Sequence, residues 1–421
     1  MKTIVQTVKG TRDFYPEDLA FRSWLYHKLG KISRSFGYQE YDGPFLEKID
    51  LYAAKSGEEL LKEQSFVFPD RSGEMITLRP ELTPSLARMV AARQNELIFP
   101  LRWWSFGPFW RYERPQKGRT REFFQWNIDL IGVNSREADA EMLAISAIFF
   151  KEVGITPQQV VIAVNDRALM EAEILKLGID PGQLKGVFHL IDRKDKMSLE
   201  DWKTYALENG ISEEHFNGLN ILLHNVDLWK QSPDLVRIFD LIKVMGVSEY
   251  IQYDPGIIRG LDYYTGIVFE AKDQEGGRAI FGGGRYNNLV ADVGGQPAGG
   301  IGFAMGDVVI RLILEKYGVK SDTLVHPAKV LVTVFDEQTA VKSIAVAASL
   351  REAGIDTICY PEASKLPRQF KFADRNGIRY ILVIGPDEIE KGTVVVKDLS
   401  NSSQETLTEG ELVKYLQAKI I

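Results

Sequence analysis

The chain has 421 residues, of which 45% are hydrophobic and 26% are charged, and its formal net charge is −7 at pH 7. This length predicts two or three domains, and the composition is typical of a soluble globular protein without a membrane span. The single cysteine, Cys359, excludes an internal disulfide and a thiolate zinc site, and the N-terminus turns polar too early for a signal peptide. We therefore expect a cytoplasmic protein without zinc.

The first hundred residues predict a helix, a hairpin and a second helix. Apolar residues at helical spacing predict a helix over 17–36, ended by Gly37. The runs SFVF and MITLRP flank a polar turn at 70–73 and predict a β-hairpin. Thr83 followed by Pro84 predicts a helix start in which the threonine is the N-cap.

The middle of the chain predicts a sheet that is interrupted by helices. Strand-like runs at 101–112 and 123–131 are joined by the polar loop ERPQKGRTRE, and a helix and a strand follow. From about 166 to 250 the chain is helical and charged, without a strand pattern. Strand-like segments punctuated by glycine return from 256 to 306 and precede another helix. This pattern predicts an α+β domain on an antiparallel sheet, with a helical insertion.

The last hundred residues have a different organisation. The segment KSDTLVHPA has the composition of a linker, and strands then alternate with helices, which predicts a small α/β domain with a largely parallel sheet. We place the two domains at 1–325 and 326–421.

A cluster of basic residues lies in the loop between the two long strands. Arginine binds phosphate through its planar fork, so such a loop suits a polyphosphate or the end of a nucleic acid. The alternative is a solvated hairpin tip. The negative net charge does not exclude nucleic acid, because binding depends on local charge. The five basic residues are Arg111, Arg114, Lys117, Arg119 and Arg121.

A row of polar residues lies along the second long strand. With a period of two, Gln125, Asn127 and Asp129 share one face, and large apolar residues occupy the other. The polar row predicts either a solvent-facing sheet or a floor that binds a small polar ligand. Arg111 and Glu113 share a face at the end of the partner strand.

The run RGLDYYTG combines an arginine, an aspartate and two tyrosines before an apolar strand. Such groups are costly to bury without partners, so the run suits a polar pocket with an aromatic wall. The neighbouring FGGGRYNN and GGIGFAMG match no phosphate-binding motif, and their glycines are consistent with turns and close backbone approach.

Several segments, in order, resemble the signatures of histidyl-tRNA synthetases. The segments are GTRDFYPED, TLRPELT, FWRYERPQKGRTREFFQWNID, RGLDYYTG, FGGGRYNNLV and KLPRQFKFADRNG, and they extend over nearly the whole chain. The resemblance implies a class II catalytic domain and a C-terminal anticodon-binding domain. It also implies activation of L-histidine by ATP with Mg²⁺, and transfer to the 3′ end of histidine tRNA. A homodimer is implied, with the first helix and Gly43-Pro44 near the interface.

The resemblance also assigns roles to individual residues. Arg111 is expected to hold the α-phosphate of ATP, with Glu113 beside it, and Phe123 to stack on adenine. Arg259 is expected to contact the substrate carboxylate and the α-phosphate. The residues expected to bind histidine are Glu81, Thr83, Gln125, Asp129, Tyr263, Tyr264, Arg285 and Tyr286.

Two positions depart from the family pattern. Many members have glutamate where this chain has Asp129, which keeps the charge and shortens the reach. Most members follow GFAMG with a glutamate and an arginine that covers the adenine, whereas this chain has Val309 at the position of the arginine. Arg311 is about 200° further around a helix and is not expected to substitute for it.

Two other functions remain as alternatives. One is a catalytically inactive regulatory subunit of ATP phosphoribosyltransferase, which shares the synthetase fold. The C-terminal domain and the intact RGLDYYTG run argue against it. The other is an RNA-binding accessory protein, and the polar row beneath the basic loop argues against that.

Overall fold

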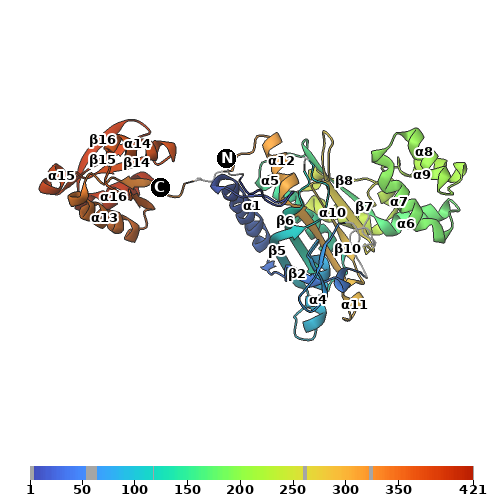
Figure 1. Ribbon diagram of the computed structural model, residues 1–421. Coiled ribbons are helices and arrows are strands. Elements are labelled where there is room, and N and C mark those ends of the chain that lie inside the picture. The colour runs from blue at the N-terminus through green and yellow to red at the C-terminus, as the bar shows by residue number, and fades with distance from the viewer. Residues whose placement is uncertain (1–3, 54–63, 117, 259–262, 322–325, 421) are drawn as a thin grey trace. The chain divides into compact units, whose positions relative to one another are not determined.

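The computed structural model describes residues 4–53, 64–116, 118–258, 263–321 and 326–420. The chain divides into two compact units, with the boundary between Ser321 and Asp322 (Figure 1). Within these ranges, no helix is long and apolar enough to cross a membrane.

The first unit is built on an eight-stranded sheet with the order β1-β5-β6-β11-β10-β9-β7-β8. Its inner pairs are antiparallel, as predicted, and only the outer pairs β1–β5 and β7–β8 are parallel. The strands are β1 (Gln39–Glu40), β5 (Leu101–Trp110), β6 (Glu122–Ile131), β7 (Val160–Asp166), β8 (Ile251–Tyr253), β9 (Ile267–Asp273), β10 (Phe281–Tyr286) and β11 (Gly300–Gly306).

Helices cover one face of this sheet and bury the apolar side of β6. Trp126 is fully buried and packs against Phe149 of α5 and Phe303 of β11. The helix predicted over 17–36 is α1, and it ends before Gly37, whose φ of +78° favours glycine. The helices are α1 (Pro16–Ser35), α5 (Arg136–Glu152), α10 (Pro233–Val244) and α12 (Asp307–Lys316).

The predicted hairpin is present, in a separate three-stranded sheet with the order β2-β4-β3. The helix after it begins at Thr83, but the N-cap is Leu82 and no side chain caps the helix. The prediction that Thr83 is the N-cap was therefore wrong by one residue. The elements are β2 (Leu46–Lys48), α2 (Asp50–Ala53), β3 (Phe66–Pro69), β4 (Met75–Leu78) and α4 (Thr83–Arg93).

The segment between β7 and β8 is helical, as its sequence predicts. A group of helices follows β7 (Figure 1), and the described residues between Arg167 and Tyr250 contain no strand. Besides α10, its elements are α6 (Arg167–Lys176), η1 (Pro181–Gln183), α7 (Leu184–Arg193), η2 (Lys194–Lys196), α8 (Leu199–Glu208), α9 (Glu213–Leu222), η3 (Leu228–Gln231) and η4 (Ser248–Tyr250). The short helix α11 (Leu289–Asp292) follows β10 and contacts α4.

The second unit is a five-stranded sheet with the order β13-β12-β14-β15-β16 and helices. The first three of these strands are parallel, and the β15–β16 hairpin adds two antiparallel pairings. The α/β class is confirmed, whereas the expectation of a largely parallel sheet holds for half of the pairings. The elements are β12 (Val330–Val332), α13 (Glu337–Glu352), β13 (Thr357–Cys359), α14 (Leu366–Arg375), β14 (Tyr380–Val383), α15 (Pro386–Lys391), β15 (Thr393–Asp398), β16 (Ser403–Thr408) and α16 (Glu409–Ile420).

Candidate active site

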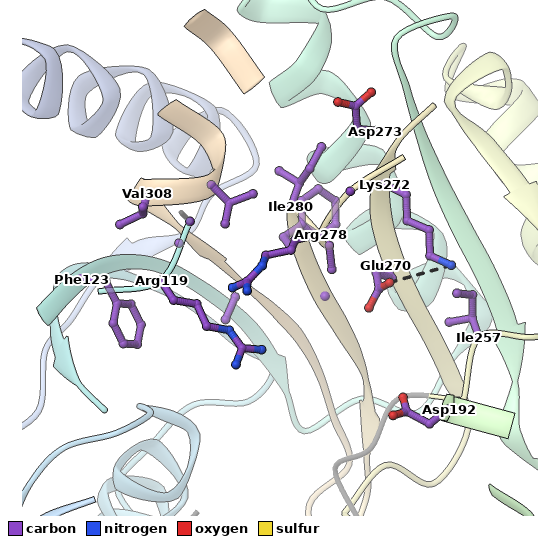
Figure 2. Close-up of a pocket in the computed structure, with 18 of the residues that line it drawn as sticks. Arg119, Phe123, Asp192, Ile257, Glu270, Lys272, Asp273, Arg278, Ile280 and Val308 are labelled. Carbon is purple, nitrogen blue, oxygen red and sulfur yellow. Dashed lines mark ion pairs between the residues drawn. The ribbon is translucent and has the colours of Figure 1, made fainter. Parts of the chain in front are cut away.

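An open pocket of about 930 Å³ lies on the sheet face opposite the helices. Gln125 lines it, while its neighbour Trp126 points into the core. The walls come from β6, β9, β10 and β11, the loop between β5 and β6, the start of α12, and α7 and η2 of the insertion (Figure 2). Segments far apart in sequence therefore meet at this face.

Glycines on β10 and β11 make room for the side chains of this face. A Cβ at Gly302 would collide with the carboxylate of Asp129 on the neighbouring strand. A Cβ at Gly284 would lie 2.7 Å from the ring of Tyr264, and one at Gly300 would meet the ring of Tyr286. The glycine runs that match no phosphate-binding motif therefore provide space beside polar and aromatic groups.

Arg111 and Phe123 lie together at the end of the pocket nearest the β5–β6 loop. The Cζ atom of Arg111 lies 5.4 Å from the centre of the Phe123 ring, and its Nε donates to the Pro80 carbonyl at 3.0 Å. Phe123 stacks on the buried Phe109, with ring centres 6.0 Å apart. The Pro80 carbonyl therefore fixes the arginine, and the Phe109 ring supports the ring of Phe123. This end presents a cation beside an aromatic face.

Of the other basic side chains in this loop, some line the pocket and others lie outside it. Arg119 lines the pocket and forms an ion pair with Glu113 at 3.0 Å. Arg121 stacks on Tyr112, with its Cζ atom 3.9 Å from the ring centre. Arg114 is exposed, and Lys117 lies outside the described residues. The solvated-tip alternative thus fits only part of the loop.

The polar row of β6 leads from the pocket to a buried cluster. Asn127 and Asp129 are only 3% and 4% exposed, so the solvent-facing alternative for this row is wrong. Tyr286 donates a hydrogen bond to Asp129 at 2.6 Å. Burial raises the pKa of Asp129 to about 7, although the hydrogen bond from Tyr286 opposes the rise. Asp129 therefore titrates near neutral pH.

Tyr263 and Tyr264 pack beside this cluster. Their ring centres are 4.9 Å apart, and the Tyr263 hydroxyl donates to Glu81 at 3.5 Å. Burial raises the pKa of Tyr263 well above its usual value and the Thr83 side chain opposes the rise, so the Thr83 side chain lies beside the cluster. Glu81, Thr83, Asp129 and the three tyrosines are thus brought together, next to the open pocket.

Tyr41 belongs to this region and was not predicted from the sequence. Its ring packs on Trp103 at 5.2 Å, and the charge of Asp129 contributes to raising its pKa, after burial as the main cause. Its hydroxyl is buried and has no hydrogen-bond partner within the ranges that the structure describes. Tyr41 directly follows the two-residue strand β1 and belongs to no recognisable motif, so the sequence contains no signal for its place beside the cluster.

Two expected site residues are placed neither in the pocket nor in the buried cluster. The guanidinium of Arg285 lies on the helix face, where Nε and Nη2 donate to Asp139 at 2.8 and 2.5 Å. The expectation that Arg285 lines the same pocket as Tyr286 is therefore wrong, because adjacent strand residues point to opposite faces. Arg285 and Asp139 are at most 1% exposed and form a structural ion pair. Arg259 lies outside the described residues.

Val309 lines the pocket at the start of α12, beside Val308. Arg311 points away from it, since it pairs with Asp18 of α1 at 2.7 Å and with Glu315 at 2.9 Å. The prediction that Arg311 does not substitute at position 309 is confirmed.

Two known protein families match, between them, nearly the whole chain. The sequence profile described as "Histidyl-tRNA synthetase" matches residues 10–307, and that described as "Anticodon binding domain" matches residues 329–419. A histidine–tRNA ligase of Thermoplasma volcanium is 38% identical, with 98% of both chains covered. A chloroplastic/mitochondrial histidine–tRNA ligase of Arabidopsis thaliana is also 38% identical, with 96% of this chain and 85% of the relative covered.

Two solved structures share the fold. The histidyl-tRNA synthetase of Nostoc sp. PCC 7120 has a TM-score of 0.84 at 24% identity and covers 99% of this chain and 100% of its own. A Bacillus halodurans protein, described as an ATP phosphoribosyltransferase regulatory subunit/histidyl-tRNA synthetase, has a TM-score of 0.74 at 19% identity. It covers 88% of this chain and 97% of its own.

Proposed function

The chain belongs to the histidyl-tRNA synthetase family, and from this premise we propose how its pocket performs the reaction. The protein is a histidine–tRNA ligase, which uses ATP to join histidine to its tRNA. The observation that carries the assignment of the site is the polar row of β6. The row connects Arg111 and Phe123 at one end with the buried Asp129–Tyr286 pair at the other. We assign ATP to the first end and the imidazole of histidine to the second.

In the first step, a carboxylate oxygen of histidine attacks the α-phosphorus of ATP, and pyrophosphate leaves. The carboxylate is already a nucleophile, so no strong general base is required. The barrier comes from bringing two anions together and from charge that develops on the phosphate, and a positioned cation lowers both contributions. The hydrogen bond from Nε of Arg111 to the Pro80 carbonyl fixes the direction of this side chain, which supports our assignment of Arg111 to this role. By resemblance, Arg259 acts from the other side of the phosphate.

In the second step, the terminal ribose hydroxyl of the tRNA attacks the carbonyl carbon of the adenylate, and AMP leaves. Histidine is selected in the buried cluster, where Asp129 and Tyr264 face the imidazole and Glu81, Thr83 and Gln125 hold the α-amino group. An apolar amino acid would leave these buried polar groups unpaired, which is a strong basis for rejecting it.

The carboxylates of the pocket fit the Mg²⁺ that accompanies ATP. No group of three or more His, Cys, Asp or Glu within the described ranges is arranged to hold a metal ion by itself. Mg²⁺ in nucleotide sites is bound chiefly by phosphates and one or two carboxylates, and Glu113 and Glu270 both line the pocket. We assign these two residues to the ion, which neutralises charge on the pyrophosphate when it is bound.

We also propose a homodimer that forms through the region of Gly43-Pro44. Leu46 of β2 and Phe68 of β3 are 49% and 40% exposed, and the strand register places both on the same face of the three-stranded sheet β2-β4-β3, next to the 45% exposed Phe45 in sequence. Apolar side chains gathered on one small sheet are typical of a surface that a partner covers.

The C-terminal unit is proposed to read the anticodon. Deletion of residues 327–421 is expected to keep histidine-dependent ATP–pyrophosphate exchange within a few-fold of wild type, because the catalytic pocket lies wholly in the first unit. The same deletion is expected to lower charging of histidine tRNA at least about a hundredfold. Both reactions are measured with the full-length and shortened proteins, and light scattering checks that both remain dimers. Equal loss of both activities from a folded dimer would contradict the division of labour.

A further inference from the structure

The wall of the pocket beyond Phe123 is apolar where α12 begins. Val308 and Val309 form it, and Arg311 is engaged with Asp18 and Glu315 elsewhere. A nucleotide base that stacks on Phe123 would therefore meet no planar group from α12. A residue from another element is needed if the base is to be held on both faces.

Arg278 reaches this place from the turn between β9 and β10. Gly276 and Gly277 have φ values of +91° and +127°, which glycine adopts readily, and the chain rejoins the sheet when the Ile280 amide donates to the Ala271 carbonyl. The side chain of Arg278 then extends into the pocket, on the side where Arg119 and Phe123 lie (Figure 2).

The stem of Arg278 and the side chain of Val309 both lie near Gly118. An ideal Cβ at Gly118 would lie 3.7 Å from Cδ of Arg278 and 3.9 Å from Cγ2 of Val309. Both side chains therefore border the same glycine in the β5–β6 loop. Arg278 supplies a guanidinium where the apolar wall has none.

The charges of Arg119 and Glu113 both act on Arg278. No ion pair joins it to a carboxylate within the part of the chain that the structure describes, whereas the neighbouring Arg119 pairs with Glu113. Partial burial, and then the nearby positive charge of Arg119, lower the pKa of Arg278, but arginine remains protonated in proteins. A half-buried planar cation without a carboxylate partner suits an aromatic ring or an anion of a ligand.

We propose that Arg278 is an ATP-binding residue whose guanidinium covers the adenine on the face opposite Phe123. The inference rests on the proposed assignment of ATP to this end of the pocket. In this chain, the residue that covers the adenine then comes from the turn between β9 and β10 and not from α12. The planar group matters here more than the charge, because a stacked guanidinium is not replaced by an ammonium group.

The test is histidine-dependent ATP–pyrophosphate exchange with the full-length protein and two variants, Arg278→Ala and Arg278→Lys. Both are expected to raise the KM for ATP about tenfold. The KM for histidine and the KM for pyrophosphate should stay within about twofold of wild type. The matched control is Arg93→Ala, since this exposed arginine pairs with Glu96 near the end of α4 and does not line the pocket.

The outcomes separate this inference from the assignment on which it rests. A wild-type protein without exchange would contradict the proposed function itself. Exchange with an unchanged KM for ATP in Arg278→Ala would overturn the role of Arg278 alone. A raised KM for pyrophosphate, or full rescue by Arg278→Lys, would also overturn the stacking role, because it would show that Arg278 contacts the phosphates. Thermal unfolding of each variant shows that the comparison is made between folded proteins.

Discussion

Replacing Arg111 with alanine is expected to lower histidine-dependent ATP–pyrophosphate exchange by at least about a thousandfold, because a cation that stabilises the charge developing on the phosphate would be lost. The guanidinium is preorganised by the Pro80 carbonyl and by the ring of Phe123. An effect of this kind falls mainly on kcat, since the contact strengthens in the transition state.

Arg114→Ala is the matched control for this prediction. Arg114 belongs to the same basic loop but is exposed and does not line the pocket, so its loss should leave the exchange within about threefold of wild type. Similar losses in the two variants would mean that the loop acts through its total charge. Near-normal exchange in Arg111→Ala would remove this arginine from the reaction.

Replacing Asp129 with asparagine is expected to raise the KM for histidine at least about a hundredfold and to leave the KM for ATP unchanged. The substitution keeps the shape of the side chain but removes the charged acceptor beside Tyr286, so a buried imidazole N–H is left with a weaker partner. Steady-state exchange at varied histidine and varied ATP separates the two constants. An equal rise in both would place Asp129 outside histidine recognition.

The same variant tests the titration of Asp129 in the protein without substrate. Its pKa of about 7 lies above the value near 4 of an unfolded chain, so between these values the folded state binds more protons. The free energy of unfolding of the wild type should therefore fall as pH rises from 4 to 7, by up to about 4 kcal/mol from this group. Asp129→Asn should lack this contribution when urea unfolding is compared at pH 5 and pH 8.

The spacing of apolar residues and the residues typical of turns were enough to predict most elements of the first unit. The apolar spacing of α1, the hairpin β3–β4 and the alternation along β6 are local patterns, and local patterns can be recognised in one sequence. The polar row Gln125–Asn127–Asp129 was recognised in the same way. The sequence left open whether this row faces solvent or forms the floor of a binding site. The burial of the row decides for the second interpretation, and burial depends on which strands lie beside β6.

The residues that were misplaced or missed depend on contacts between distant segments. Arg285 was expected beside Tyr286 because the resemblance to histidyl-tRNA synthetases assigned both residues to the same pocket. In a strand the two residues must face opposite ways, and the partner of Arg285 is Asp139 of α5. Arg278 follows two glycines that predict a turn, but its direction into the pocket is determined by how β9 pairs with β10. Thr83 was misassigned by only one residue, which is the usual uncertainty of a helix boundary.

The most direct test of the central claim is ATP–pyrophosphate exchange by the purified full-length protein, with each of the twenty amino acids in turn. The proposed site predicts robust exchange with histidine and, for the others, rates at least about a thousandfold lower, because they leave the Asp129 cluster unpaired. Absence of exchange with histidine in a folded dimer at saturating ATP would contradict the account and favour the regulatory relative of the same fold.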